Sequence, residues 1–351
     1  MSRLIWYLFL SVSCSAALLA GPAKRNSEAT DLRFAPPLMG YVFDRSLGRI
    51  RTVVGIPGAA RVTDPVKLDF KLEHALLGAG GALAIASISG GVALTVVGAL
   101  DSQPTAVLVE NSMPDFDLGA FNGPGSAAIL YGTGCKCIQV IGGLPDSPRV
   151  SRNIDSTSLP GAVLALAVSD DQSIAAVAVA SSEDGSSPSR ILLFDLNGDS
   201  TPPPIITSAS SLAFTPNGKD LVVTDAPGGS VSLALNAGGV VNVASASVSA
   251  GGDAISNPGA IAFTNDGLLL IADRAGLVHV IDLQTKERRS AGCSCRPDSM
   301  ERMKDKSTYR LTGIEAGAVW ILDTSGASPR TLFVPLDALA NTDSLPAEVA
   351  Q

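Results

Sequence analysis

Four cysteines, arranged as two Cys-x-Cys pairs, are the residues of this sequence best suited to chemistry. The pairs are Cys135 with Cys137 and Cys293 with Cys295. Residues i and i+2 of a strand face the same side, with Cα atoms roughly 6–7 Å apart, at the upper edge of disulfide geometry. A modest kink would let each pair bond, and oxidation is favoured after export. We therefore predict two local disulfides or pairs of unreactive thiols, with thiolate binding of a soft metal such as copper as the alternative.

Aspartates recur where an apolar, strand-like run gives way to a turn. A carboxylate at such a position can accept hydrogen bonds from the backbone N–H groups of the turn. Turn capping is therefore the predicted role, and binding of a cation or a sugar is the alternative. The six positions are Asp44, Asp195, Asp225, Asp273, Asp282 and Asp323.

One of these aspartates begins a run of alternating oxygen ligands. Asp195, Asn197 and Asp199 are spaced as in calcium-binding loops, but the rest of such a loop, including its terminal Glu, is missing. These three residues are the metal-ligand candidates of the sequence. Calcium is accordingly the one cofactor that the sequence suggests, and no other cofactor is predicted.

Histidine is too scarce here for a metal-hydrolase cluster. His74 precedes a strand-like run and His279 lies inside one, so we predict structural roles for both. The sequence contains no G-x-S-x-G, H-E-x-x-H or Walker motif, and no complete G-x-G-x-x-G. No catalytic residue is predicted, and a non-enzymatic function is favoured over an enzymatic one.

These residues lie in a sequence that repeats itself. A strand, a tight polar turn and a second strand recur, with spacings of 44, 47, 46 and 49 residues between successive turns. Asn-Gly and Asp-Gly in the turns supply the positive φ that a reversing chain needs. The five turns lie at residues 78–81, 122–125, 169–172, 215–218 and 264–267.

A second element lies between these turns, an apolar pair followed by Asp, a short turn and another strand. Each period of about 45 residues therefore holds about four short strands, as a β-propeller blade does. Stacked blades bury the faces that a single blade leaves exposed. The copies span 40–55, 190–208, 277–289 and 318–334, and the stretches 136–150 and 231–243 fit with the Asp replaced.

Two stretches carry a resemblance to known repeats. LVVTDAPGGSVSLAL (221–235) and LLLIADRAGLVHVIDL (268–283) resemble the repeats of YVTN-type and NHL-type propellers of bacterial surface and secreted proteins. The resemblance covers most of residues 40 to 335 and implies an all-β propeller of four-stranded blades. It is specific for the architecture and unspecific for function. The Trp-Asp ends of WD40 repeats are absent.

The blade count depends on the hairpin at 40–55. Six periods run from about 68 to 335, and this hairpin is left over. If it is half of a further blade, the propeller has seven blades. If it closes the ring beside the last blade, the propeller has six. We favour seven. On such a ring the two Cys-x-Cys pairs lie several blades apart, which argues against a four-Cys zinc site.

The ends of the chain read as segments outside the propeller. Arg3, an apolar run from Leu4 to Leu10 that resumes to Ala20, and small residues up to Ala23 predict a signal peptide over 1–23. An extended leader over 24–37, the propeller over 38–335 and a tail over 336–351 complete the predicted organisation. We expect a periplasmic or extracellular protein without a membrane span after signal removal, and a lipid anchor through Cys14 is disfavoured.

Composition narrows the function further. The net charge is −8, with no basic block, so nucleic-acid binding is not expected. The densest charge run, residues 300–306, is predicted to be a solvated loop between blades, with a short helix as the alternative.

The sequence leaves three candidate functions open. The first is a binding scaffold that presents loops to a protein, peptide or glycan; the oligomeric state stays open. The second is a metal-dependent enzyme of the lactonase type, which needs carboxylates or amides converging on the channel. The third is redox or copper handling through the Cys-x-Cys pairs. The glutamates of the predicted blades do not recur at matching places in the repeats; they lie at 73, 110, 183, 287, 301 and 315.

Overall fold

The short apolar runs and glycine-containing turns of this sequence fold into strands. In the computed structural model, the described part of the chain contains 26 strands and no α-helix. In that part there is accordingly no helix with the length and apolar character needed to cross a membrane. The structure describes residues 36–337 apart from 79, 182–188, 199–203, 207, 217, 219, 235–254 and 315–316.

The strands form seven sheets, numbered here as blades 1 to 7 along the chain. Blades 1 and 2 are β1 (Leu38–Asp44), β2 (Arg49–Ile56) and β3 (Ala59–Pro65), then β4 (Leu72–Leu77), β5 (Ala84–Ile88), β6 (Thr95–Gly98) and β7 (Thr105–Leu108). Blades 3 and 4 are β8 (Leu118–Phe121), β9 (Ala128–Gly132), β10 (Cys137–Gly142) and β11 (Arg149–Asp155), then β12 (Val163–Val168), β13 (Ile174–Val179), β14 (Arg190–Asp195) and β15 (Ile205–Ile206). Blades 5 and 6 are β16 (Ser211–Phe214), β17 (Leu221–Asp225) and β18 (Ser230–Ala234), then β19 (Pro258–Phe263), β20 (Leu269–Asp273), β21 (Leu277–Ile281) and β22 (Arg288–Gly292). Blade 7 is β23 (Glu301–Arg302), β24 (Thr308–Arg310), β25 (Val319–Asp323) and β26 (Arg330–Val334).

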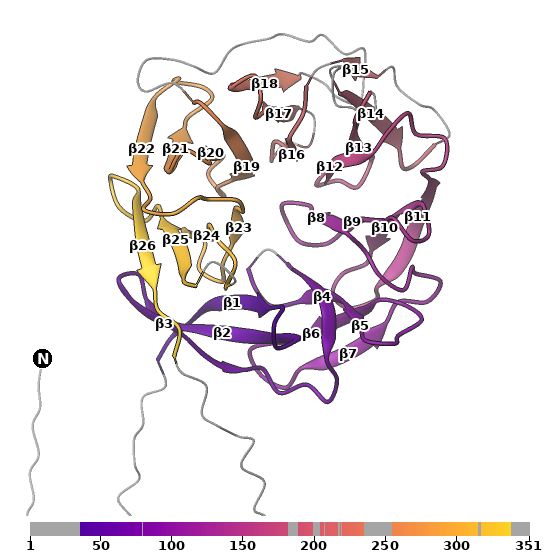
Figure 1. The fold of residues 1–351 in the computed structure, drawn as a ribbon, viewed down its shortest axis with the longest axis horizontal. Helices are drawn as coiled ribbons and strands as arrows, with labels where there is room; N and C mark the ends of the chain where they lie inside the picture. Colours follow the sequence, from indigo (N-terminus) through magenta and orange to yellow (C-terminus); the bar gives the residue numbers. More distant parts are fainter. Residues whose placement is uncertain are drawn as a thin grey trace, which may run out of the picture. The chain divides into compact units, whose positions relative to one another are not determined.

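Each blade is an antiparallel meander, and the seven blades stand in a ring (Figure 1). In blades 2 to 7 the first strand lies toward the centre of the ring and the last described strand lies toward its rim. The prediction of a seven-bladed all-β propeller is therefore confirmed. Five blades have four strands, and blades 1 and 5 have three strands within the described residues.

The core is divided among the blade interfaces. Seven clusters of buried side chains fill the seven interfaces, and each cluster draws its members from two neighbouring blades. Strands in the middle of a blade are covered on both faces and are therefore continuous apolar runs, as β13 (IAAVAV) shows. Outer strands such as β11 (RVSRNID) are mostly exposed and carry charge. This division explains why small and β-branched residues dominate the sequence.

The alternation of strand direction gives the ring two different faces. We call the face with the turns between first and second strands, and between third and fourth strands, the hairpin face. The opposite face carries the turns between second and third strands and the connections between blades, and we call it the connector face. All five turns predicted from the repeats connect first and second strands, and the last residue of each has φ between 58° and 85°. In each, that residue's N–H donates to the carbonyl three positions earlier, at 2.7–3.0 Å.

Blade 1 runs in the opposite direction to its neighbours. The end of β1 lies near the start of β4, where the Leu72 N–H donates to the Gly48 carbonyl at 3.0 Å. The start of β1 lies by the end of β23, where the Lys304 N–H donates to the Met39 carbonyl at 2.8 Å. The turn at 45–48 is therefore on the connector face. The hairpin at 40–55, grouped in the sequence with the outer hairpins of other blades, is instead β1 and β2, and β3 continues the same sheet.

The ring closes between blade 1 and the end of the chain. Val62 of β3 forms a parallel bridge with Leu336. The Val62 N–H donates to the Pro335 carbonyl and the Asp337 N–H donates to the Val62 carbonyl, both at 2.9 Å. Contacts of the propeller therefore extend to Asp337, two residues beyond the boundary drawn from the sequence. The predicted signal peptide, residues 24–35 of the predicted leader and the predicted tail after residue 337 lie outside the described residues.

Candidate functional site

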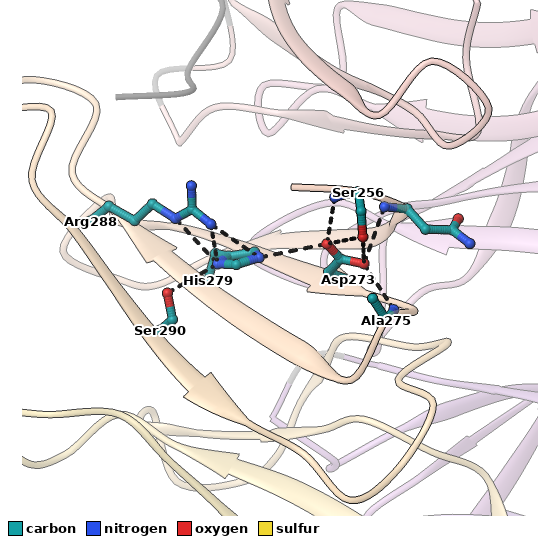
Figure 2. Close-up of polar contacts among 7 residues, drawn as sticks. Ser256, Asp273, Ala275, His279, Arg288 and Ser290 are labelled. Carbon is teal, nitrogen blue, oxygen red and sulfur yellow. Dashed lines mark hydrogen bonds and ion pairs between the residues drawn. The ribbon is translucent and has the colours of Figure 1, made fainter. Parts of the chain in front are cut away.

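His279 and Asp273 form a polar cluster inside blade 6 (Figure 2). Both side chains are fully buried. Asp273 ends β20 and His279 lies two positions into β21, and the register of the hairpin places His279 opposite Ile271. Nε2 of His279 is 3.8 Å from Oδ2 of Asp273. The predicted structural placement of His279, inside a strand, is confirmed.

Asp273 is held by backbone groups from two segments. Its carboxylate accepts N–H bonds from Ala275 at 2.9 Å, Ser256 at 2.8 Å and Asn257 at 3.2 Å. Burial acts to raise the pKa of Asp273, but these three bonds, together with His279, hold that pKa below its ordinary value. The ionised carboxylate thus ties the turn after β20 to the connection that enters blade 6.

The far side of the imidazole is occupied by β22. Nη2 of Arg288 donates to Nδ1 of His279 at 2.9 Å, and the Ser290 hydroxyl lies 3.2 Å from the same nitrogen. The same Nη2 atom of Arg288 also lies 3.4 Å from Nε2, so the guanidinium contacts both nitrogens of the ring. The line Asp273, His279, Ser290 has the residue types of a hydrolytic triad. Arg288 already uses the nitrogen that would activate the serine, so the cluster joins β20, β21 and β22 rather than preparing a nucleophile.

His74 is placed differently, at the connector face. It lies in β4, and its Nδ1 is 2.8 Å from Oδ1 of Asp115 in the connection between blades 2 and 3. The two side chains are 28% and 43% exposed, so the pair is open to solvent. Burial raises the pKa of Asp115, but bonds from His74 and Ser87 outweigh it and keep that pKa below its ordinary value. Sequence reasoning did not find this pair, because residues 41 positions apart meet only when blades 2 and 3 stack.

The two Cys-x-Cys pairs are also on the connector face. Cys135 lies in the turn between β9 and β10, and Cys293 follows β22 in the connection to blade 7. Within the pairs the Cα atoms are 5.2 Å and 5.0 Å apart, closer than in a regular strand and within bonding range. The kink predicted to be necessary is present at the first pair, where Lys136 has a φ of 50°. The pairs belong to different blades, so each is local, as predicted.

The recurring aspartates are turn caps, as predicted. Each accepts a backbone N–H from a residue two or three positions further on, at 2.7–3.2 Å. The pairs are Asp44 with Leu47, Asp195 with Asn197, Asp225 with Gly228, Asp273 with Ala275, Asp282 with Gln284 and Asp323 with Ser325.

The calcium candidates are only partly placed. One carboxylate oxygen of Asp195 accepts hydrogen bonds from the N–H groups of Asn197 and Gly198, at 2.9 and 3.0 Å. Asp199 lies outside the described residues. Among the described residues, no three His, Cys, Asp or Glu side chains come close enough together to hold a metal ion.

Arg302 spans the hairpin face, and the sequence did not indicate this. The charge run at 300–306 contains β23, the first strand of blade 7, so the prediction of a solvated loop or short helix there is wrong. Met303 is 3% exposed, which shows how the apolar residues of the run anchor it. The Arg302 guanidinium donates to Oδ1 of Asn265 in blade 6 and, at 3.1 Å, to the carbonyl of Gly123 in blade 3. One side chain thus connects blades on opposite sides of the ring.

Asp170 of blade 4 extends this network. Its carboxylate accepts the Gly123 N–H at 2.8 Å. Burial raises the pKa of Asp170, the Gly123 bond lowers it, Asp171 raises it again and Arg302 lowers it, and the net direction is upward. A carboxyl with a raised pKa disfavours the folded state once it ionises, so its contribution to stability falls as the pH rises through that pKa.

We expect Asp170→Asn to raise the melting temperature at neutral pH by about 1–3 °C and to leave it unchanged below the ordinary carboxyl pKa. Asparagine can still accept the Gly123 N–H but cannot ionise. Asp171→Asn is the matched control, because bonds from Ser169 and Ser173 lower the pKa of Asp171 and its loss should destabilise at neutral pH. Thermal unfolding at the two pH values measures both. Equal signs for the two variants would contradict the assignment.

Comparison with known proteins supports the fold. No protein-family model matches the chain, and no curated protein matches it. The hydrazine synthase of Kuenenia stuttgartiensis is similar in structure, with a TM-score of 0.58 and 16% sequence identity over 85% of this chain and 99% of that chain. A functionally unknown protein from Desulfotomaculum acetoxidans DSM 771 has a TM-score of 0.48 and 15% identity over 84% of this chain and 78% of that chain. At this identity the likeness to hydrazine synthase establishes a shared propeller fold alone.

Proposed function

We propose that this chain is an extracytoplasmic binding protein that uses the connector face of its propeller to hold a protein, peptide or glycan. The observation that carries the proposal is the contrast between the two faces. The connector face presents the solvent-open pair His74–Asp115 and the exposed turn at 133–136. The hairpin face is crossed by Arg302, whose guanidinium is already bonded to blades 3 and 6.

Export and repeat type belong to the same proposal. The apolar N-terminal run supports secretion, and the repeats at 221–235 and 268–283 support a YVTN-like or NHL-like propeller. Loops on a rigid scaffold are the usual place for binding residues. In the blades, the recurring aspartates cap turns and His279 joins neighbouring strands, which favours a scaffold over an enzyme.

The test uses a matched pair of lysines. Lys136 and Lys286 are both exposed, both lie in turns with positive φ, and they lie on opposite faces of the ring. Labelled protein is applied to glycan and peptide arrays. We expect Lys136→Glu to weaken binding to the retained ligands about tenfold or more, and Lys286→Glu to leave binding within about twofold. Equal losses, or no ligand on either array, would contradict the proposal.

The lactonase alternative has less support. It needs three or more carboxylate or amide groups converging on a cation in the channel. Arg302 places a fixed positive charge at the hairpin face, and Glu301 beside it is paired with Arg310. Hydrolysis of simple lactones with added calcium or zinc is the direct test, and we expect no turnover.

The calcium and copper alternatives are tested together. A thermal-shift screen with calcium and with copper, run on the protein before and after reduction, reports binding of either ion. We expect no shift with calcium and none with copper when the Cys-x-Cys pairs are oxidised.

A further inference from the structure

The turn between β9 and β10 departs from the other turns of its kind. In the turns between second and third strands of blades 5, 6 and 7, and in the β1–β2 turn of blade 1 on the same face, the last residue is glycine with φ between 59° and 92°. In each the glycine N–H donates to the carbonyl three positions earlier, at 3.0–3.3 Å. The glycines are Gly48, Gly229, Gly276 and Gly317. Blade 3 makes the same turn and the same bond, from Lys136 to Thr133 at 3.3 Å, but its left-handed residue is a lysine.

Lysine is an unfavourable choice at that position. A side chain in the left-handed region crowds its own backbone, and such residues are concentrated at functional sites. Here the strained residue is Lys136, the single residue between Cys135 and Cys137, so a disulfide between them would close a loop that contains it. The backbone strain at Lys136 is therefore located within the loop that the disulfide would close.

The two cysteines of this turn differ in exposure. Cys135 and Lys136 are exposed, while Cys137 is half-buried against the cluster between blades 2 and 3. An ammonium group next to a thiol stabilises its thiolate, which speeds departure of that thiolate from a disulfide. At the start of the turn, the Thr133 N–H donates to the carboxylate of Asp117 at 2.7 Å.

The second pair has the opposite surroundings. Cys293 and Cys295 are both half-buried and pack on the cluster between blades 6 and 7. The Cys293 N–H donates to the carbonyl of Gly276 at 2.8 Å. The pair is thus bonded to the turn between β20 and β21, whose left-handed residue is a glycine. These contacts suit a bond that holds a connection in place.

We propose that both pairs are disulfides and that Cys135–Cys137 is a thiol-exchange site for dithiol substrates, while Cys293–Cys295 is structural. A substrate thiolate attacks Sγ of Cys135, forming a mixed disulfide and releasing the Cys137 thiolate. The second thiol of the substrate, deprotonated, then displaces Cys135. The substrate leaves as a disulfide, the protein gains two electrons, and the two cysteines take up protons to become thiols. This activity goes beyond the proposed binding function and needs none of its ligands.

The experiment measures the two pairs separately in the folded protein. Full-length oxidised protein is treated with limiting dithiothreitol under native conditions, quenched with an alkylating reagent at intervals and analysed by peptide mass spectrometry. We expect Cys135–Cys137 to be reduced at least about tenfold faster than Cys293–Cys295. In concentrated guanidinium chloride the rates should become similar, because the difference comes from the fold.

Variants separate strain from charge. Lys136→Gly removes both, and we expect it to lower the fraction reduced at a fixed dithiothreitol ratio by roughly fivefold or more. Lys136→Gln keeps the strain and loses the charge, so it should slow reduction while leaving that fraction near wild type. Lys286→Gly is the control and should change neither. The proposal is overturned if the native rates are equal, if Cys293–Cys295 reacts first, or if either pair is found as free thiols in the exported protein.

Discussion

Replacing Asp273 by alanine should lower the free energy of unfolding by about 3–5 kcal/mol. The substitution leaves the buried N–H groups of Ser256, Asn257 and Ala275 without their charged acceptor. It also removes the charge that Nε2 of His279 faces. Because the bonds come from a turn and from a blade connection, the loss loosens blade 6 at two places. Denaturant unfolding of the two proteins measures the difference.

The pH dependence identifies the cause. The pKa of Asp273 is lower in the folded protein than its ordinary value of 3.8. Its stabilising effect is therefore complete above that ordinary value and is lost as the pH falls through the folded pKa. The gap between wild type and Asp273→Ala should accordingly narrow in acid. Asp282→Ala is the control, since Asp282 also caps a turn but is only half-buried, and its effect should be much smaller. A gap that stays constant with pH would show that lost packing, rather than lost charge, is responsible.

Replacing Asp337 by proline should open the closure of the ring. Proline has no N–H to donate to the Val62 carbonyl and restricts Leu336 before it, which we expect to cost about 3 kcal/mol or more. For a chain of this size the melting temperature should fall by roughly 5–10 °C.

Asp337→Ala is the matched control for this prediction. It keeps the backbone N–H and loses only the ion pair with Arg61, whose members are 3.4 Å apart and 58% and 39% exposed. An exposed pair of this kind contributes about 0–1 kcal/mol. Equal melting temperatures for the proline and alanine variants would show that the bridge from Val62 does not hold the ring closed.

The repeats predicted the architecture because local turn chemistry recurs in register with it. Each of the five turns ends in a glycine or another residue of positive φ, and six other turns have an aspartate cap. Both features depend only on neighbours within a few positions. The same information counted seven blades once the hairpin at 40–55 was treated as part of a blade. It did not give the direction of blade 1, since a hairpin has the same local pattern whichever way it stands in the ring.

The parts of the site that depend on stacked blades could not be predicted. Arg302 belongs to a run of seven residues rich in charge, and nothing in that run indicates that its partner is a carbonyl in blade 3. His74 and Asp115 meet across a blade interface. The Cys-x-Cys pairs were visible because both members are close in sequence, but their unequal exposure comes from the blades around them.

The closure of the ring also has a consequence for how the chain is made. The Arg51 side chain donates to the Asp337 carbonyl across 286 positions of sequence. During synthesis blade 1 is made long before residues 336–337, because the rest of the ring lies between them in the sequence. Contacts of such long range form slowly, so the growing chain is an open arc whose two end blades each expose an apolar face. Those two faces are where a chaperone, or a second unfinished chain, would bind before residues 336–337 are synthesised.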